Sequence, residues 1–102
     1  NLIEYRNISK FKNLPIVYGE PKNFKILLDD LIKINFPAEQ ILTYRHLKVN
    51  RWDIEMIDKK ILKLPEKNYT KGLIDFMNIK DKPNFKKYKI FDYRINNQLI
   101  LK

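Results

Sequence analysis

The sequence of 102 residues contains no cysteine, and it has only two glycines, one alanine, one serine and one histidine. Without cysteine the chain can form neither disulfide bonds nor thiolate ligands for zinc. A small domain without disulfides is typical of a reducing compartment. Gly19 and Gly72 cannot form G-x-G-x-x-G or G-x-x-x-x-G-K, so the sequence argues against a nucleotide-dependent enzyme.

Long apolar runs are also missing. Aliphatic runs such as Ile26–Leu28 reach three residues, whereas a membrane-spanning helix needs about 20. We therefore expect no transmembrane segment, and no secretory signal is visible. The sequence begins at Asn1 rather than at methionine, which fits a chain that has lost an import presequence, or a fragment. On this basis we expect a mitochondrial location, or otherwise the cytoplasm.

Catalytic groups are scarce. His46 is the only histidine and Ser9 the only serine, so neither a histidine-rich metal site nor a serine–histidine–aspartate triad is indicated. Asp29 and Asp30 are adjacent, and neighbours on a helix point about 100° apart. We expect no catalytic residue, no metal, no cofactor and no small-molecule substrate. A nuclease, the enzyme alternative, would need a carboxylate cluster around residues such as Asp29 or Asp53.

The chain is strongly basic, with a net charge of +9. Residues 1–25 carry +3, residues 26–79 carry +1 and residues 80–102 carry +5. Such a balance is typical of proteins with an anionic partner, most often nucleic acid. The alternative is codon usage, because lysine, asparagine and isoleucine all have A/T-rich codons. Codon usage acts evenly along a chain, so the basic ends favour the functional interpretation.

Hydrophobic spacing predicts helices in several places. Phe24, Leu27, Leu28, Leu31 and Ile32 form one stripe, which predicts a helix over 21–35 with Asn23 as its N-cap. Pro37 is expected to start a second, short helix. Residues 43–49 are ambiguous, and we expect a helix that gives way to extended chain. Residues 51–64 carry both a helical stripe and an alternating pattern at Trp52, Ile54 and Met56, and their length favours a helix.

Two further segments complete the expected fold. Residues 68–79 resemble a helix capped by Thr70, and residues 85–102 a hairpin that turns at Asn96-Asn97. No internal repeat stands out. The expected fold class is α+β: a small single domain of three to four short helices plus a C-terminal β-hairpin, with an extended basic N-terminal arm. The arm is assigned to residues 1–23 and the domain to residues 24–102.

Bases alternate with aromatic residues between Lys80 and Arg94. Ammonium groups can contact phosphates, and rings or guanidinium groups can stack on unpaired bases. The alternative is a strand that buries its rings and exposes its lysines. A smaller basic group surrounds Trp52, which we expect in the core. The predicted RNA-binding residues are Lys10, Lys12, Arg45, Lys48, Arg51, Lys82, Lys86, Lys87, Tyr88, Lys89 and Arg94.

These patterns predict a non-catalytic, structural subunit of a ribonucleoprotein. A mitochondrial ribosomal protein that contacts rRNA phosphates and neighbouring proteins through its basic ends fits them. The alternative is an accessory subunit of a purely protein assembly, such as a respiratory complex, without nucleic-acid contact.

Overall fold

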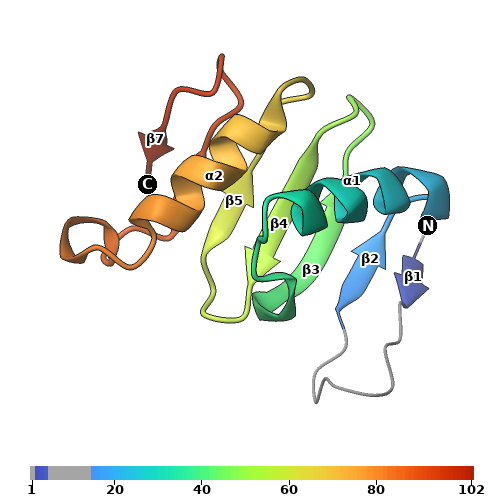
Figure 1. Ribbon diagram of the computed structural model, residues 1–102, viewed down its shortest axis with the longest axis horizontal. Helices are drawn as coiled ribbons and strands as arrows, with labels where there is room; N and C mark the ends of the chain where they lie inside the picture. Colours follow the sequence, from blue (N-terminus) through green and yellow to red (C-terminus); the bar gives the residue numbers. More distant parts are fainter. Residues whose placement is uncertain (1, 5–14) are drawn as a thin grey trace.

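The computed structural model describes residues 2–4 and 15–102 of the chain. Its elements are β1 (Leu2–Glu4), β2 (Ile16–Tyr18), α1 (Pro21–Lys33), the 3₁₀ turn η1 (Ala38–Gln40), β3 (Ile41–His46), β4 (Trp52–Met56), β5 (Ile61–Lys63), α2 (Tyr69–Ile79), the 3₁₀ turn η2 (Pro83–Phe85), β6 (Ile90–Asp92) and β7 (Ile100–Leu101). The strands form one sheet in the order β1 to β7 (Figure 1). Neighbouring strands are antiparallel, except for the parallel pairs β2–β3 and β5–β6.

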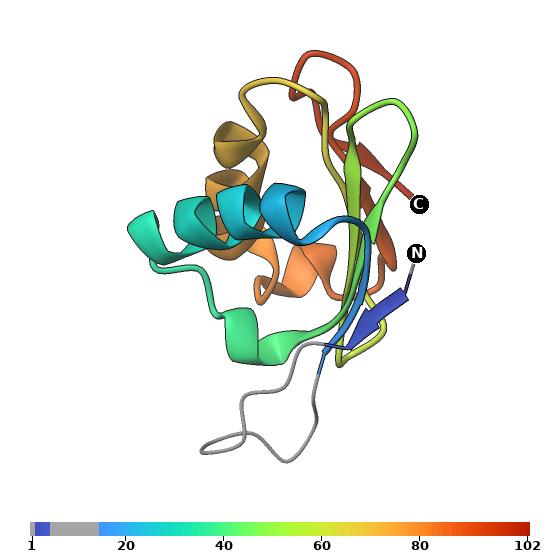
Figure 2. The ribbon, with the colours of Figure 1, turned by 90° about the vertical axis from the view of Figure 1, so that its right-hand side faces the viewer.

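Both α-helices lie on the same face of the sheet (Figure 2). Parallel neighbours need a crossover connection, and here α1 connects β2 to β3 while α2 connects β5 to β6. The opposite face of the sheet, here called the open face, is covered by neither helix.

The expected fold class is wrong. The described residues contain two α-helices and a seven-stranded mixed sheet, not three to four helices with a separate hairpin. β6 and β7 do pair antiparallel, but they continue the sheet that begins at β1. Most strands have only two to five residues, and alternation over so short a length is a weak signal.

Residues 43–49 and 51–64 account for most of the error. The first segment lies largely in β3, and the second forms the hairpin of β4 and β5. β4 buries Trp52, Ile54 and Met56 and leaves the residues between them half-buried, so the alternating pattern was the correct one. Lys59 has a φ of 78° at the turn of this hairpin, where the sequence shows no Asn-Gly or Asp-Gly signal.

The predicted helix over 21–35 is confirmed as α1. Pro21 occupies its first turn and Glu20, not Asn23, is the N-cap. Asn35, with a φ of 58°, follows the helix, and the Phe36 N–H then donates to the Leu31 carbonyl at 2.9 Å. This is a Schellman motif in which asparagine takes the left-handed position that glycine usually holds.

Asparagine takes this role at several turns. Positive φ values occur at six described non-glycine residues, of which five are asparagines: Asn35, Asn50, Asn68, Asn96 and Asn97. Asparagine tolerates the left-handed region better than most residues. A chain with two glycines therefore still forms tight turns.

The predicted helix over 68–79 is confirmed as α2, with Asn68 rather than Thr70 as its N-cap. Gly72 lies against β6: a Cβ at this position would be 3.0 Å from Cγ and 3.2 Å from Cβ of Tyr93. The glycine is therefore a close-packing residue and not only a weak helix former.

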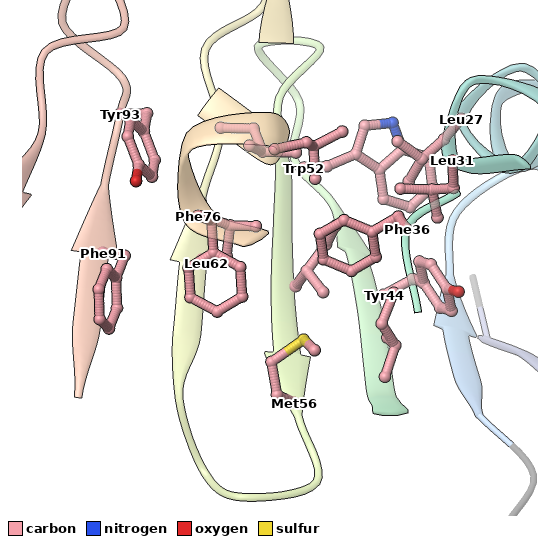
Figure 3. Close-up of a cluster of buried hydrophobic side chains, with 14 of the residues drawn as sticks. Leu27, Leu31, Phe36, Tyr44, Trp52, Met56, Leu62, Phe76, Phe91 and Tyr93 are labelled. Atoms are coloured by element: carbon pink, nitrogen blue, oxygen red, sulfur yellow. The ribbon is translucent and has the colours of Figure 1, made fainter. Parts of the chain in front are cut away.

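The core lies between the helices and one row of the sheet (Figure 3). In this row the paired residues are all apolar or aromatic and run from β2 to β7: Val17, Tyr44, Ile54, Leu62, Phe91 and Leu101. Phe76 of α2 packs edge-on against Phe91 at 5.0 Å, and Phe24 of α1 against Tyr44 at 4.8 Å. Trp52 is buried in this core, as expected.

The two parallel crossovers repeat one supersecondary unit, a strand, a helix, a parallel strand and an antiparallel strand, although no internal repeat stands out in the sequence. Val17 pairs with Tyr44, which pairs with Ile54, and in the second unit Leu62 pairs with Phe91, which pairs with Leu101. A gapless alignment of the sequence of residues 16–34 with that of residues 61–79 matches six identities: Ile16 with Ile61, Lys22 with Lys67, Asn23 with Asn68, Leu28 with Leu73, Asp30 with Asp75 and Ile34 with Ile79. In this correspondence β4 of the first unit is equivalent to β7 of the second.

Residues 1–23, expected as a basic arm, contain several ordered elements. Leu2–Glu4 and Ile16–Tyr18 form β1 and β2, and α1 begins at Pro21. Lys10 and Lys12 lie outside the described residues.

Candidate functional site

The predicted RNA-binding residues do not form one surface. Lys48 and Arg51 lie in the connection after β3, and Lys82, Lys86, Lys87, Tyr88 and Lys89 lie in the connection before β6. Strands β3 and β6 run in the same direction, because β3–β4 and β4–β5 are antiparallel and β5–β6 is parallel. The end of β3 and the start of β6 are therefore at opposite ends of the sheet.

The aromatic residues between these bases face inward. Phe91 and Tyr93 are buried, and Phe85 and Tyr88 are partly buried against the core. Base stacking needs an exposed ring face, so the alternative interpretation of this segment, buried rings with exposed lysines, describes the structure better.

Two of the predicted arginines are held by neighbouring side chains. Arg94 donates from Nε and Nη2 to the Asp92 carboxylate, with a shortest distance of 2.7 Å. These hydrogen bonds lower the pKa of the Asp92 carboxyl below its usual value, against the opposing effect of burial. Arg45 lies over the ring of Tyr18, with 4.4 Å between its Cζ and the ring centroid.

A row of alternating charges crosses the open face. The paired residues of this row, from β2 to β7, are Tyr18, Arg45, Asp53, Lys63, Asp92 and Ile100. Opposite charges on neighbouring strands stabilise a sheet by about 0.2–1 kcal/mol per pair. The two cations and two anions of the row balance each other in charge.

Asp53 is the member of this row that has a buried side-chain oxygen without a hydrogen bond to another described residue. Its Oδ1 is buried and has no hydrogen-bond partner among the described residues, and the same holds for Nε of the half-buried Arg51. Burial raises the pKa of the Asp53 carboxyl, and the positive charges of Lys63, Arg94 and Arg51 oppose this shift.

His46 packs against the indole ring of Trp52, with 4.7 Å between the ring centroids. Across residues 2–4 and 15–102 there is no group of three or more histidine or acidic side chains that could hold a metal ion. No helix in the same part of the chain is long and apolar enough to cross a membrane.

The outer edge of β7 is a feature that the sequence analysis did not identify. β7 pairs with β6 on one side, and no other described strand pairs with it on the other side. Leu99 and Leu101 are partly buried against the core, while Ile95 and Ile100 are exposed. An aliphatic strand at the edge of a sheet is a template for another strand. In the sequence, the run Leu99–Leu101 was the only signal.

In comparisons with known proteins, no protein family model matches the chain and no curated protein resembles it significantly.

Proposed function

We propose that this domain is a non-catalytic binding subunit of a protein assembly, and that it takes up an extended segment of a partner polypeptide along the outer edge of β7. This corresponds to the alternative function that the sequence left open. The observation that carries the proposal is the direction of the Leu101 backbone.

Hydrogen bonds around β7 define that direction. The Lys102 N–H donates to the Ile90 carbonyl, and the Ile90 N–H donates to the Lys102 carbonyl, both at 3.1 Å. Such hydrogen-bonded pairs alternate with non-hydrogen-bonded pairs in an antiparallel ladder. Leu101, which is opposite Phe91, is in a non-hydrogen-bonded pair. Its N–H and C=O therefore point away from β6, towards the outer edge.

The internal repeat indicates how a partner strand would lie. β4 is the equivalent of β7, and its outer edge is occupied by the antiparallel strand β5, with Ile54 opposite Leu62. By the same geometry a partner strand would run antiparallel to β7 and place an apolar residue opposite Leu101. Side chains alternate along a strand, so its neighbours would lie on the open face beside Ile100.

Strand addition of this kind obtains affinity from backbone hydrogen bonds and specificity from alternate side chains. Ile100 in β7 and Ile95 in the connection between β6 and β7 are exposed and leave apolar surface for the partner to cover. Natural edge strands are commonly blunted by lysine, proline or a bulge. In β7 only the adjacent Lys102 has this character.

The ribonucleoprotein function, with rRNA as partner, stays a prediction of lower rank. Arg94 is occupied by Asp92, and Arg45 lies over Tyr18 on a charge-balanced face. The rings that were expected to stack on bases are turned into the core. Among the predicted residues that the structure describes, the exposed Lys48 and the exposed lysines of residues 82–89 still favour a polyanion.

Selection of displayed peptides on the immobilised chain tests the proposal. We expect the selected peptides to alternate apolar and polar residues and to lose binding when Leu101→Pro removes the outward N–H. Proline is tolerated where a strand N–H faces outward, so circular dichroism of this variant should remain that of the wild type. Selected peptides that bind the Leu101→Pro variant equally well would contradict the proposal.

A further inference from the structure

Most of the net charge lies in three short segments. Residues 57–60, 80–89 and 102 contain eight lysines and two aspartates, a balance of +6, whereas the other residues from 15 to 101 balance at +1. Codon usage does not explain a charge confined to so few positions. The exposed members of this group, here called the lysine end, are Lys59, Lys82, Lys86, Lys87, Lys89 and Lys102.

Hydrogen bonds hold the three segments together. Buried Lys60 donates from Nζ to the Tyr88 carbonyl at 3.0 Å and to the Lys86 carbonyl at 3.4 Å. The Lys89 N–H donates to the Lys102 carbonyl at 2.9 Å. The turn after β4, the connection before β6 and the residue after β7 therefore form one end of the molecule, with their backbones fixed before any partner arrives.

No ion pair with another described residue neutralises the ammonium groups of the lysine end. The two acids within the three segments have other partners, since Asp81 pairs with Lys80 at 3.0 Å and Asp58 accepts the Lys60 N–H. Lys87 lies over the ring of Tyr88, with 5.2 Å between its Nζ and the ring centroid, which leaves its charge in place. Six ammonium groups without an ion pair among the described residues produce a positive potential that attracts a polyanion.

The composition of this end distinguishes between polyanions. It contains lysine but no arginine, and Phe85 and Tyr88 are turned towards the core, so it lacks the planar groups that stack on bases. It does present an apolar side chain, Ile57, which is half exposed beside Lys59. Exposed lysines together with an exposed aliphatic side chain suit a layer of phosphate headgroups above hydrocarbon.

We propose that the lysine end binds the surface of a membrane that contains anionic phospholipid. The ammonium groups would contact lipid phosphates, and Ile57 would enter the headgroup layer. The contact is peripheral and electrostatic, with each lysine contributing roughly fivefold to the partition coefficient. This site adjoins the outer edge of β7 at Lys102, but it does not depend on the proposed strand addition.

Co-sedimentation of the full chain with vesicles tests the proposal. We expect binding to mixed phosphatidylcholine–phosphatidylglycerol vesicles and none to phosphatidylcholine alone, with a steep loss as salt rises. The triple variant Lys82→Gln, Lys86→Gln, Lys87→Gln should bind on the order of 100-fold more weakly. The matched control is the triple variant Lys25→Gln, Lys33→Gln, Lys71→Gln, which removes the same charge from exposed helix positions. It should bind vesicles within a few-fold of the wild type, because salt screens lysines that are far from the membrane surface.

Three outcomes would overturn the proposal. Equal loss in the two triple variants would mean that total charge, not the lysine end, causes binding. Absence of binding to anionic vesicles at low salt would exclude the site. Tighter binding to single-stranded RNA than to vesicles at equal phosphate concentration, abolished by the first triple variant, would assign the lysine end to nucleic acid instead.

Discussion

Tyr93, directly after β6, donates a hydrogen bond from its hydroxyl to the carboxylate of Asp75 in α2, at 2.6 Å. The first residue of α2, Tyr69, donates in the same way to Asp30 of α1. Asp30 and Asp75 occupy equivalent positions in the two repeated units. Each helix is therefore anchored to another element by one tyrosine–aspartate contact.

Tyr93→Phe should lower the free energy of unfolding by about 1–2 kcal/mol, because the Asp75 carboxylate loses a buried donor. Burial and this hydrogen bond raise the pKa of Tyr93, so the donor is present throughout the neutral range. Urea denaturation measures the change. Tyr18→Phe is the control, because its hydroxyl forms no hydrogen bond with another residue that the structure describes, and it should change stability by less than about 0.5 kcal/mol. Equal effects of the two substitutions would contradict the anchoring role.

Gly72→Ala should destabilise the protein although alanine is the better helix former by about 1 kcal/mol. The new methyl group would be 3.0 Å from Cγ of Tyr93, and that ring cannot move away without losing its bond to Asp75. We expect a net loss of about 1–2 kcal/mol. Asn78→Ala, at an exposed position of the same helix, should instead be neutral or stabilising. If Gly72→Ala stabilised the protein instead, the prediction would be wrong, and α2 could move away from Tyr93 without cost.

Asp92→Asn should destabilise the protein in a pH-dependent way. Arg94 lowers the pKa of Asp92 in the folded chain, so the carboxylate stabilises the fold fully above its unfolded pKa of about 3.9. That contribution is lost as pH falls through the lower, folded-state pKa. We expect a loss of about 1–3 kcal/mol near neutral pH, which shrinks in acid. Urea denaturation of the wild type and the variant across the pH range measures the difference in their free energies of unfolding. A difference that stays constant into acid would show that the Asp92 charge does not cause it.

Lys60→Met should loosen the connection before β6. The variant keeps the apolar stem but leaves the Lys86 and Tyr88 carbonyls without their donor, which lowers stability by about 1–3 kcal/mol. Hydrogen exchange of residues 80–89 should become faster. Lys59→Met, at the exposed neighbouring position, serves as the control. Unchanged exchange in Lys60→Met would mean that the connection is held by its other contacts.

The helices could be predicted because their signals are long and local. Leu27 and Leu31 repeat along one face of α1, and Pro21 marks its start. The hairpin of β4 and β5 could not be predicted in this way. Its apolar residues also match a helical period, at Ile54, Ile57, Ile61 and Leu64. Only pairing with β3 and β6 decides between the two, and pairing partners are distant in the sequence.

For the candidate site, too, the sequence predicts local features but not those that depend on a partner residue or a neighbouring strand. The lysines of residues 82–89 could be identified because a charged, exposed side chain needs no partner. Arg94 is among the predicted RNA-binding residues, although Asp92, the last residue of β6 and two residues earlier in the chain, holds it. The edge at β7 could not be predicted, because whether Leu101 has a free N–H depends on the register of β6 and β7.

Amide hydrogen exchange of Leu101 tests strand addition at β7 most directly. In the free chain this amide should exchange quickly, because its N–H points away from β6, while the Lys102 amide, bonded to Ile90, should exchange slowly. Addition of a selected peptide should slow exchange at Leu101 to the rate of a ladder amide. Leu101 protection in the free chain, or peptide binding that leaves Leu101 exchanging freely, would contradict the account.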